Sequence, residues 1–307
     1  MAALNYAKEY ARELAQAYPY TLYFGAIWSA IKPNVKFVNA KTVEIPSLTT
    51  TGRTNGDRDS IGTFGRHYDN NWETKTLSKH RTWDTLVHPR DIDETNHVAS
   101  IANITKVFNE EQKFPEMDAE AISTLFALKN AQSPITAKTN GYLTINNVLT
   151  EFDSMMDAMD EKRVPQTGRK LYCDTFTKTL IDTAKESARF LHATDEEVKR
   201  KLSRIDEVEI ISVPTDLMKS AYTFYTGSEA SGQNNGYAPA SGAKNVKMML
   251  IHLSAVIPVV SYEFAQLEAP SAMSKGKYVY FEESFEDIFI FNKKHDAIQF
   301  LVENPSA

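Results

Sequence analysis

Cysteine is nearly absent from this chain: Cys173 is the single one in 307 residues. One thiol excludes an intramolecular disulfide framework and is compatible with a reducing compartment. A run of about 18 consecutive apolar residues is also missing, which excludes a membrane-spanning helix of ordinary length. Residues 1–20 lack the apolar segment and the small-residue cleavage site of a secretory signal. These absences together predict a soluble, intracellular, globular protein.

An excess of positive charge is missing too. The chain has 34 Lys and Arg against 40 Asp and Glu, which gives a formal net charge of −6. Sequence-specific nucleic-acid binding normally shows a clustered positive surface, so this composition argues against it. Hydrophobic residues make up 42% and aromatic residues 11% of the chain, enough for a sizeable core. The length suits about two domains of roughly 150 residues each.

The motifs of common enzymes are absent as well. There is no P-loop and no dinucleotide fingerprint, since Gly62 and Gly65 form only a lone G-x-x-G. The sequence GSEASG at 227–232 has the wrong spacing for a nucleophile elbow. Cys173 has no histidine nearby in the sequence and is expected to be a packed side chain. We therefore predict no catalytic, cofactor-binding or metal site, and no enzymatic activity.

One cluster offers an alternative to that prediction. The segment HPRDIDETNH contains His88, Asp91, Asp93, Glu94 and His97, and side chains of these types bind metals. The same residues also suit a helix start, because acids complement the positive end of the helix dipole and Asp93 is a favourable N-cap. We favour the helix start. The other histidines show no paired spacing; they are His67, His80, His192, His252 and His295.

The first ninety residues show an aromatic segment followed by two polar arms. Residues 4–30 have aromatic and apolar groups at helical spacing, interrupted by Pro19, and are expected to pack on their own domain or on a neighbouring chain. Alternating patterns at 35–45 and 72–82 predict strands, with a Gly-, Asn- and Asp-rich loop between them. Both faces of these strands look polar. Because a hairpin alone is marginally stable in water, this one is expected to project and rest on something else.

The rest of the chain alternates between helical and strand patterns. Helices are predicted at 91–130 with a break or kink at Pro115, at 144–160, and at about 174–190. The second of these has a methionine-rich stripe typical of core packing, formed by Val148, Phe152, Met155 and Met159. A polar loop is predicted at 226–244. Strands are predicted around Lys170, Leu171 and Tyr172, and at 208–214, 246–260 and 277–291.

Three ordered motifs resemble a known family. They are the strand WETKTL at 72–77, the helix start DIDETN at 91–96, and the turn EKRVPQTGR from Glu161 to Arg169. With the aromatic N-terminal segment and the C-terminal strands, they make nearly the whole chain similar to the major capsid proteins of tailed bacteriophages, particularly those of phages that infect Gram-positive bacteria. None of the motifs is catalytic. The resemblance implies an α+β fold of the HK97 type.

The resemblance also implies a division of the chain. Residues 1–34 correspond to the N-terminal arm and 35–90 to the extended loop (E-loop), which reaches over an adjacent subunit. Residues 91–137, with the spine helix, and 256–307 correspond to the peripheral domain. Residues 138–255 correspond to the axial domain, whose tip gathers around the five-fold and six-fold axes.

The implied function is a coat protein that assembles as pentamers and hexamers into an icosahedral shell around double-stranded DNA, located in the virion and assembled in the host cytoplasm. The implied partners are further copies of the chain, a portal protein, a decoration protein in some members, and packaged DNA held by non-specific contact. Because Met1 leads directly into the arm, we expect a separate scaffolding protein. Some members join subunits by a Lys–Asn isopeptide bond, but no such pair is evident by motif here.

Two alternatives stay open at this point. An encapsulin-type compartment shares the fold and encloses enzyme cargo instead of a genome. A metal-dependent hydrolase would use the cluster between His88 and His97, and it would bind metal and form a small oligomer. The acidic net charge suits a shell around DNA, since an inner wall that bound phosphate tightly would hinder packaging.

Overall fold

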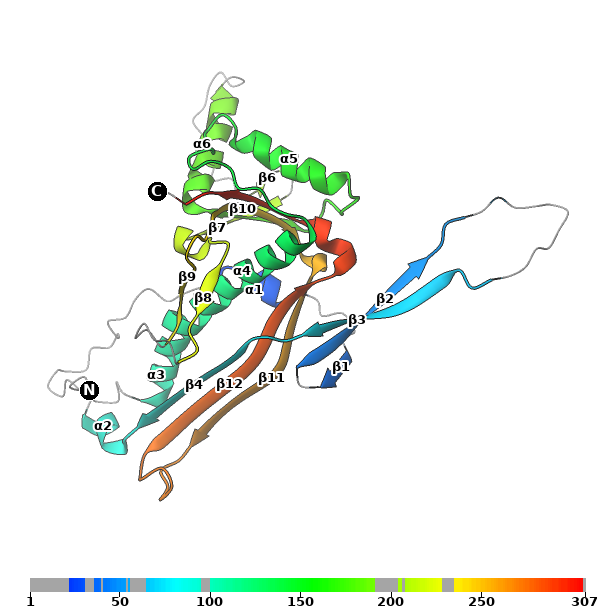
Figure 1. The fold of residues 1–307 in the computed structure, drawn as a ribbon. Coiled ribbons are helices and arrows are strands. Elements are labelled where there is room, and N and C mark those ends of the chain that lie inside the picture. Colours follow the sequence, from blue (N-terminus) through cyan, green and yellow to red (C-terminus); the bar gives the residue numbers. More distant parts are fainter. Residues whose placement is uncertain are drawn as a thin grey trace.

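The computed structural model describes residues 22–30, 36–39, 41–53, 55, 65–94, 100–190, 204–205, 208–227 and 235–305. In this part of the chain, a mixed five-stranded sheet and a long three-stranded sheet lie on either side of one helix, α4 (Phe114–Gln132) (Figure 1). A hairpin projects from the body beside them. Of the arm expected at 1–34, residues 1–21 and 31–34 lie outside the described residues.

The five-stranded sheet has the order β13-β10-β5-β7-β6. Its strands are β5 (Arg169–Asp174), β6 (Arg204–Ile205), β7 (Val208–Val213), β10 (Asn245–His252) and β13 (Ile298–Glu303). β5 pairs with β7 in parallel and with β10 antiparallel. The central strands are apolar on both sides because helices cover both faces of the sheet, and this explains their continuous hydrophobic runs.

Two helices cover one face of this sheet. They are α5 (Val148–Asp160) and α6 (Thr175–Phe190). The predicted stripe of α5 is confirmed, because Val148, Phe152, Met155 and Met159 are all buried. They pack in a cluster with Leu171 and other side chains of β5 and β10. The methionines are therefore core residues.

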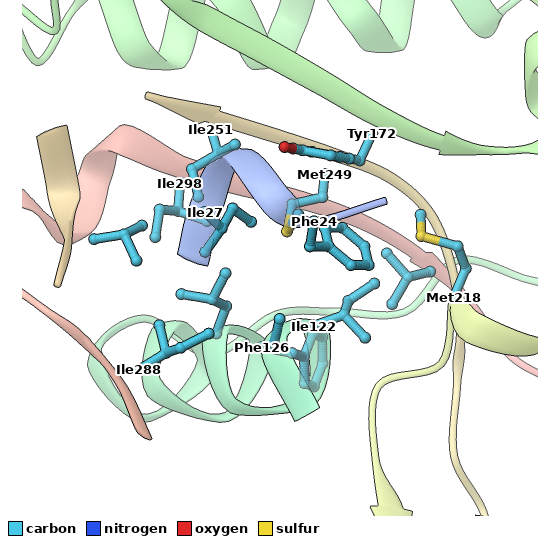
Figure 2. Close-up of a cluster of buried hydrophobic side chains, with 14 of the residues drawn as sticks. Phe24, Ile27, Ile122, Phe126, Tyr172, Met218, Met249, Ile251, Ile288 and Ile298 are labelled. Carbon is cyan, nitrogen blue, oxygen red and sulfur yellow. The ribbon is translucent and has the colours of Figure 1, made fainter. Parts of the chain in front are cut away.

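The opposite face packs on α4 and on the short helix α1 (Gly25–Trp28). In Figure 2, Phe24 and Ile27 lie between the sheet above, with Tyr172, and α4 below, with Ile122 and Phe126. The Asp118 carboxylate of α4 is buried and accepts hydrogen bonds from the backbone N–H groups of Tyr23, at 2.8 Å, and Phe24, at 3.0 Å. These bonds satisfy the two N–H groups directly before α1 and hold the segment on α4.

The helix predicted at 91–130 forms in pieces. The helix α2 (Pro89–Glu94) is followed by α3 (Ile101–Phe108), then by a π-helical turn (Asn109–Lys113) that continues into α4. Pro115 does not break the helix. It lies in the first turn of α4, directly after the π-helical turn, where Phe114 N–H donates to the carbonyl of Asn109. A proline is tolerated there because the first turn of a helix needs no i−4 donor from it.

The predicted N-cap role of Asp93 is wrong. Asp93 is near the end of α2, which begins at Pro89. The residue that caps α3 is Ser100, whose side chain accepts from Asn103 N at 3.4 Å. Sequence reasoning extended one helix across both segments, and so it placed the helix start at the acidic residues.

The second sheet has the order β11-β12-β4, with β4 (His80–Val87), β11 (Val256–Glu268) and β12 (Tyr278–Ile290), all antiparallel. The strand predicted at 246–260 is therefore two strands, β10 and β11, which lie in different sheets. They separate at a short turn (Leu253–Ala255), in which His252 Nδ1 accepts from Ser254 N at 3.3 Å. The strand predicted at 277–291 is confirmed as β12.

The projecting hairpin consists of β1 (Lys36–Asn39), β2 (Thr42–Thr50) and β3 (Tyr68–Thr76) in the order β1-β2-β3. The arm predicted through Thr82 is split at Leu77–Lys79, because β4 pairs with β12 instead.

A further small sheet joins β8 (Tyr222–Phe224) to β9 (Tyr237–Pro239), so part of the loop predicted at 226–244 is a strand. Residues 228–234 of that loop lie outside the described part of the chain.

The turn EKRVPQTGR is organised by a buried arginine. The Arg169 side chain is fully buried and donates to the carbonyl oxygens of Val164, at 2.7 Å, and Pro165, at 2.9 Å, and to Asp160 Oδ1, at 2.5 Å. The hydrogen bond from Arg169 lowers the pKa of the Asp160 carboxyl below its ordinary value. The motif therefore has a structural role: it fixes the chain between α5 and β5.

We predict that Arg169→Met lowers the free energy of unfolding by at least about 2 kcal/mol, because the two carbonyl groups lose their charged donor in a site with little access to water. Chemical denaturation measures this change. Asp160→Asn serves as the control, since Asp160 is partly exposed, and it should cause a much smaller loss. Equal losses in the two variants would show that the carbonyl contacts of Arg169 contribute little.

Candidate functional site

The hairpin has two different faces, which the strand register defines. Residues directly opposite each other in an antiparallel pair point to the same face. Val43 pairs with Lys75 and Ile45 with Glu73, and this face is buried at its base. Pro46 pairs with Trp72 and Thr50 with Tyr68, so these residues lie on the other face.

That other face carries an exposed apolar row, the hairpin stripe: Leu48, Tyr68 and Trp72. Their side chains are 62%, 56% and 42% exposed. Cations lie over the rings, since Lys36 Nζ is 5.9 Å from the centroid of Trp72 and the Arg66 guanidinium carbon is 4.7 Å from the centroid of Tyr68. A large exposed apolar row with a cationic border is typical of a surface that binds another protein.

The base of the hairpin is anchored in the body. Val43 and Ile45 of β2 and Leu77 after β3 form one buried cluster with Ile257, Val259 and Phe289 of the three-stranded sheet. The expectation that the arms are polar on both faces is therefore wrong at the base. Two further contacts hold it: Lys293 Nζ donates to the carbonyl of Leu48 at 2.8 Å, and Lys75 Nζ to Asn292 Oδ1 at 2.8 Å.

The three-stranded sheet also has one covered and one open face. Its inner face meets the helices: Trp83 stacks on Phe108 of α3 with centroids 3.8 Å apart, and Arg81 pairs with Glu116 of α4 at 2.5 Å. Register places alternate residues on the opposite side, which we call the outer sheet face. Leu86 there is 59% exposed.

The outer sheet face combines aromatic and acidic side chains. Phe264 and Phe281 have ring centroids 6.2 Å apart, and Phe285 stacks on His80 at 4.1 Å. Phe281 lies opposite Asp84, and Glu283 lies opposite Phe264. This surface is therefore apolar along its middle and negatively charged beside it, whereas Lys36 and Arg66 border the hairpin stripe.

The candidate metal cluster has another explanation in this structure. His88 lies just before α2, and its Nδ1 accepts from Arg90 N at 3.1 Å, while Arg90 pairs with Glu94 at 3.2 Å. Within the described ranges, no group of three or more His, Cys, Asp or Glu side chains is arranged to hold a metal ion. His97 lies outside those ranges. The residues that the structure does describe thus act in local helix contacts.

Cys173 is buried in the core beside α6. Burial raises the pKa of its thiol to about 12, so it is protonated at neutral pH.

His252 Nε2 lies 3.1 Å from the carbonyl of Thr167, and burial lowers the pKa of this imidazole. His192 is outside the described residues. In the described part of the chain, no helix has the length and apolar character to cross a membrane.

Sequence reasoning missed the hairpin stripe. Leu48 is separated from Trp72 by more than twenty residues, and only the pairing of β2 with β3 brings Trp72, Pro46 and Leu48 into one row. A weak signal was present. Tyr68 and Trp72 are four positions apart, and residues at even spacing in one strand point to the same face.

Similar proteins are found only among solved structures, and not by sequence comparison. No protein-family model and no curated protein sequence matches the chain. The capsid of the cyanophage P-SCSP1u is 10% identical, with a TM-score of 0.68, and the match covers 98% of this chain and 93% of that chain. For the mature capsid of bacteriophage PhiM1 the identity is 9%, the TM-score 0.65, and the coverage 98% and 93%.

The chain has the fold of a phage capsid subunit. The capsid of Ralstonia phage GP4 agrees, with 9% identity, a TM-score of 0.59, and coverage of 98% of this chain and 96% of that chain. The α+β, HK97-type fold implied by the resemblance is therefore confirmed. Each match spans both chains almost completely, so the similarity concerns the fold of the whole chain.

The two ends of β2 should respond differently to mutation. Ile45→Ala removes a buried side chain from the cluster at the hairpin base, so we expect a loss of about 2–4 kcal/mol in the free energy of unfolding. Leu48→Ser changes an exposed residue three positions away, and its effect should stay within about 0.5 kcal/mol. Parallel urea titrations compare them. A large loss for Leu48→Ser would mean that the hairpin stripe is already covered within one chain.

Proposed function

We propose that this protein is the major capsid protein of a tailed phage, which assembles as pentamers and hexamers into an icosahedral shell around double-stranded DNA. The observation that carries the proposal is the match to capsid structures over 98% of the chain. The exposed hairpin stripe supports it, because such a row is costly for a monomer and useful in an assembly, where a neighbour covers it.

The proposal includes the division of the chain given above. Residues 1–34 are the N-terminal arm, 35–90 the E-loop, 91–137 with 256–307 the peripheral domain, and 138–255 the axial domain. The projecting hairpin supports the second of these assignments, and the five-stranded sheet with α5 and α6 supports the last. The strand β4 marks the point where the E-loop meets the peripheral sheet.

Within the shell, the hairpin stripe of one copy lies on the outer sheet face of a neighbouring copy. Leu48, Tyr68 and Trp72 supply apolar area, and Leu86 and Phe281 supply a matching row. Charge complementarity supports this choice, since Lys36 and Arg66 lie over the rings of the hairpin stripe while Asp84, Glu268 and Glu283 belong to the outer sheet face. Complementary charge fixes register between partners more than it adds affinity.

The protein acts as a structural component of the virion and not as an enzyme. The buried, protonated Cys173 and the local helix contacts of His88 support this view. Portal, scaffolding and decoration proteins, and packaged DNA, are the further partners that we expect on the basis of the fold. Assembly in the host cytoplasm belongs to the same expectation.

The first test is assembly itself. We expect the purified chain, alone or with the scaffolding protein of the same phage, to form closed megadalton particles visible by negative-stain electron microscopy. Sedimentation that shows only monomers and dimers under both conditions would contradict the proposal. Particles that enclose an enzyme instead of DNA would favour an encapsulin-type compartment, and stoichiometric bound metal in a small oligomer would favour the hydrolase.

The second test separates folding from assembly. The triple variant Leu48→Ser, Tyr68→Ser, Trp72→Ser should melt cooperatively near the wild-type temperature but form no closed particles, because the apolar contact is lost at every repeated interface. Thr49→Ala with Asp69→Asn is the control on the opposite face of the hairpin, and it should assemble. Normal shells from the triple variant would show that the hairpin stripe does not mediate assembly.

A further inference from the structure

A buried carboxyl group lies at the junction between the hairpin and the body. Glu120 on α4 is 2% exposed. Its Oε1 atom is buried and has no hydrogen-bond partner among the described residues. A buried polar atom without a partner carries a free-energy penalty, and a buried ionised carboxylate carries a larger one.

The surroundings of Glu120 are mostly acidic. Glu286 and Asp287 on β12 are 7% and 4% exposed, and Glu116 lies one turn earlier on α4. The nearby cations are Lys79, which follows β3, and Arg81 on β4. Arg81 is already paired with Glu116. Burial, followed by the charge of Glu286, raises the pKa of the Glu120 carboxyl well above its ordinary value, and Lys79 opposes this only in part.

Two of these acidic residues hold the connector between the hairpin and the sheet, residues Leu77–Lys79: Asp287 through its carboxylate and Glu286 through its backbone N–H. Asp287 Oδ2 accepts from Ser78 N at 2.9 Å and from Ser78 Oγ at 3.0 Å. The backbone N–H of Glu286 donates to the carbonyl of Lys79 at 3.3 Å. The connector is thus bonded to the two residues of β12 whose charges act on Glu120.

Contacts beyond the connector extend this junction to the β8 strand. Lys79 Nζ lies 4.3 Å from the centroid of the Phe224 ring, and Arg81 donates to the carbonyl of Tyr225 at 2.7 Å. A shift of the connector therefore changes contacts with β12 and with β8 at the same time.

We propose that Glu120 is a proton-dependent latch: when protonated it lets the connector seat against β12, and when ionised it releases the connector and changes the hold on the hairpin. Ionisation places a third negative charge beside Glu286 and Asp287 in a buried site. Opening of the connector relieves this repulsion and admits water to the carboxylate. The inference goes beyond the proposed function, because it concerns one chain and holds whether or not shells form.

The direction of the pH dependence follows from the raised pKa. A group that binds its proton more tightly in the closed state stabilises that state fully at low pH. This stabilisation is lost as the pH rises from about 4.3, the ordinary value for glutamate, through the raised pKa. Each pKa unit of difference between closed and open states changes the opening equilibrium by up to about tenfold.

Hydrogen–deuterium exchange of the full-length chain tests the latch, with light scattering to report particle size in the same samples. The amides of Ser78 and Glu286 report opening, and peptides from β10 serve as an internal reference. After correction for intrinsic exchange, protection of the two amides should fall by about tenfold or more between pH 5.5 and pH 8.5. The reference peptides should keep their protection.

Three variants make the test specific. Glu120→Gln cannot ionise, so protection at Ser78 should become independent of pH. Glu286→Gln removes a repelling charge and should move the transition to lower pH. Glu283→Gln changes a carboxylate on the outer sheet face of the same strand and should behave as wild type.

Two results would overturn the proposal. One is a wild-type chain whose protection at Ser78 does not depend on pH. The other is a Glu120→Gln variant with the wild-type pH dependence. If Glu120→Gln does not fold, an unmoved transition in Glu286→Gln overturns the proposal equally. Light scattering shows the assembly state separately, so failure of the latch and failure of shell formation give different results.

Discussion

The burial of α4 between two sheets is the constraint on which the rest of the structure depends. Its apolar side chains, among them Ile122 and Phe126, contact the five-stranded sheet on one side and Ile288 of β12 on the other. The helix therefore joins two layers that have no common strand. Its polar groups serve the same purpose, since buried Asp118 holds α1 and buried Lys129 donates to the carbonyl of His295 at 3.0 Å. The hairpin is attached to this two-sheet body through the cluster at its base.

The chain covers some of its apolar surfaces itself and leaves others exposed, and the two kinds lie in different parts of the structure. The five-stranded sheet is covered on both faces, and its central strands are apolar throughout. The hairpin stripe and the outer sheet face instead leave aromatic and aliphatic side chains exposed on regular strands. A hairpin has too little volume to bury its own apolar row, so the row needs a second surface. In a shell, a small free energy at one such contact is repeated by every subunit.

The charge distribution follows the same separation. The net charge of −6 hides a cationic hairpin border, with Lys36 and Arg66 over aromatic rings, and an acidic outer sheet face. Acidic side chains also gather where the hairpin joins the body, because the charges of Glu286 and Asp287 act on Glu120.

The HK97-type fold was expected from the resemblance of ordered motifs to a known family. Local patterns in the sequence were sufficient to predict the α5 stripe and the strands at 208–214 and 277–291, which form β7 and β12. These features depend on neighbours within one turn or one strand, and their periodicity is visible without the rest of the chain. The Ser100 cap is a local bond from Asn103 N, which sequence reasoning missed because it extended one helix across 91–130. Tertiary structure alone decided two other features, the separation of β10 from β11 and the row that joins Leu48 to Trp72, and each depends on strand pairing between distant segments. Local sequence does not encode that register, because it is selected by the burial of whole faces.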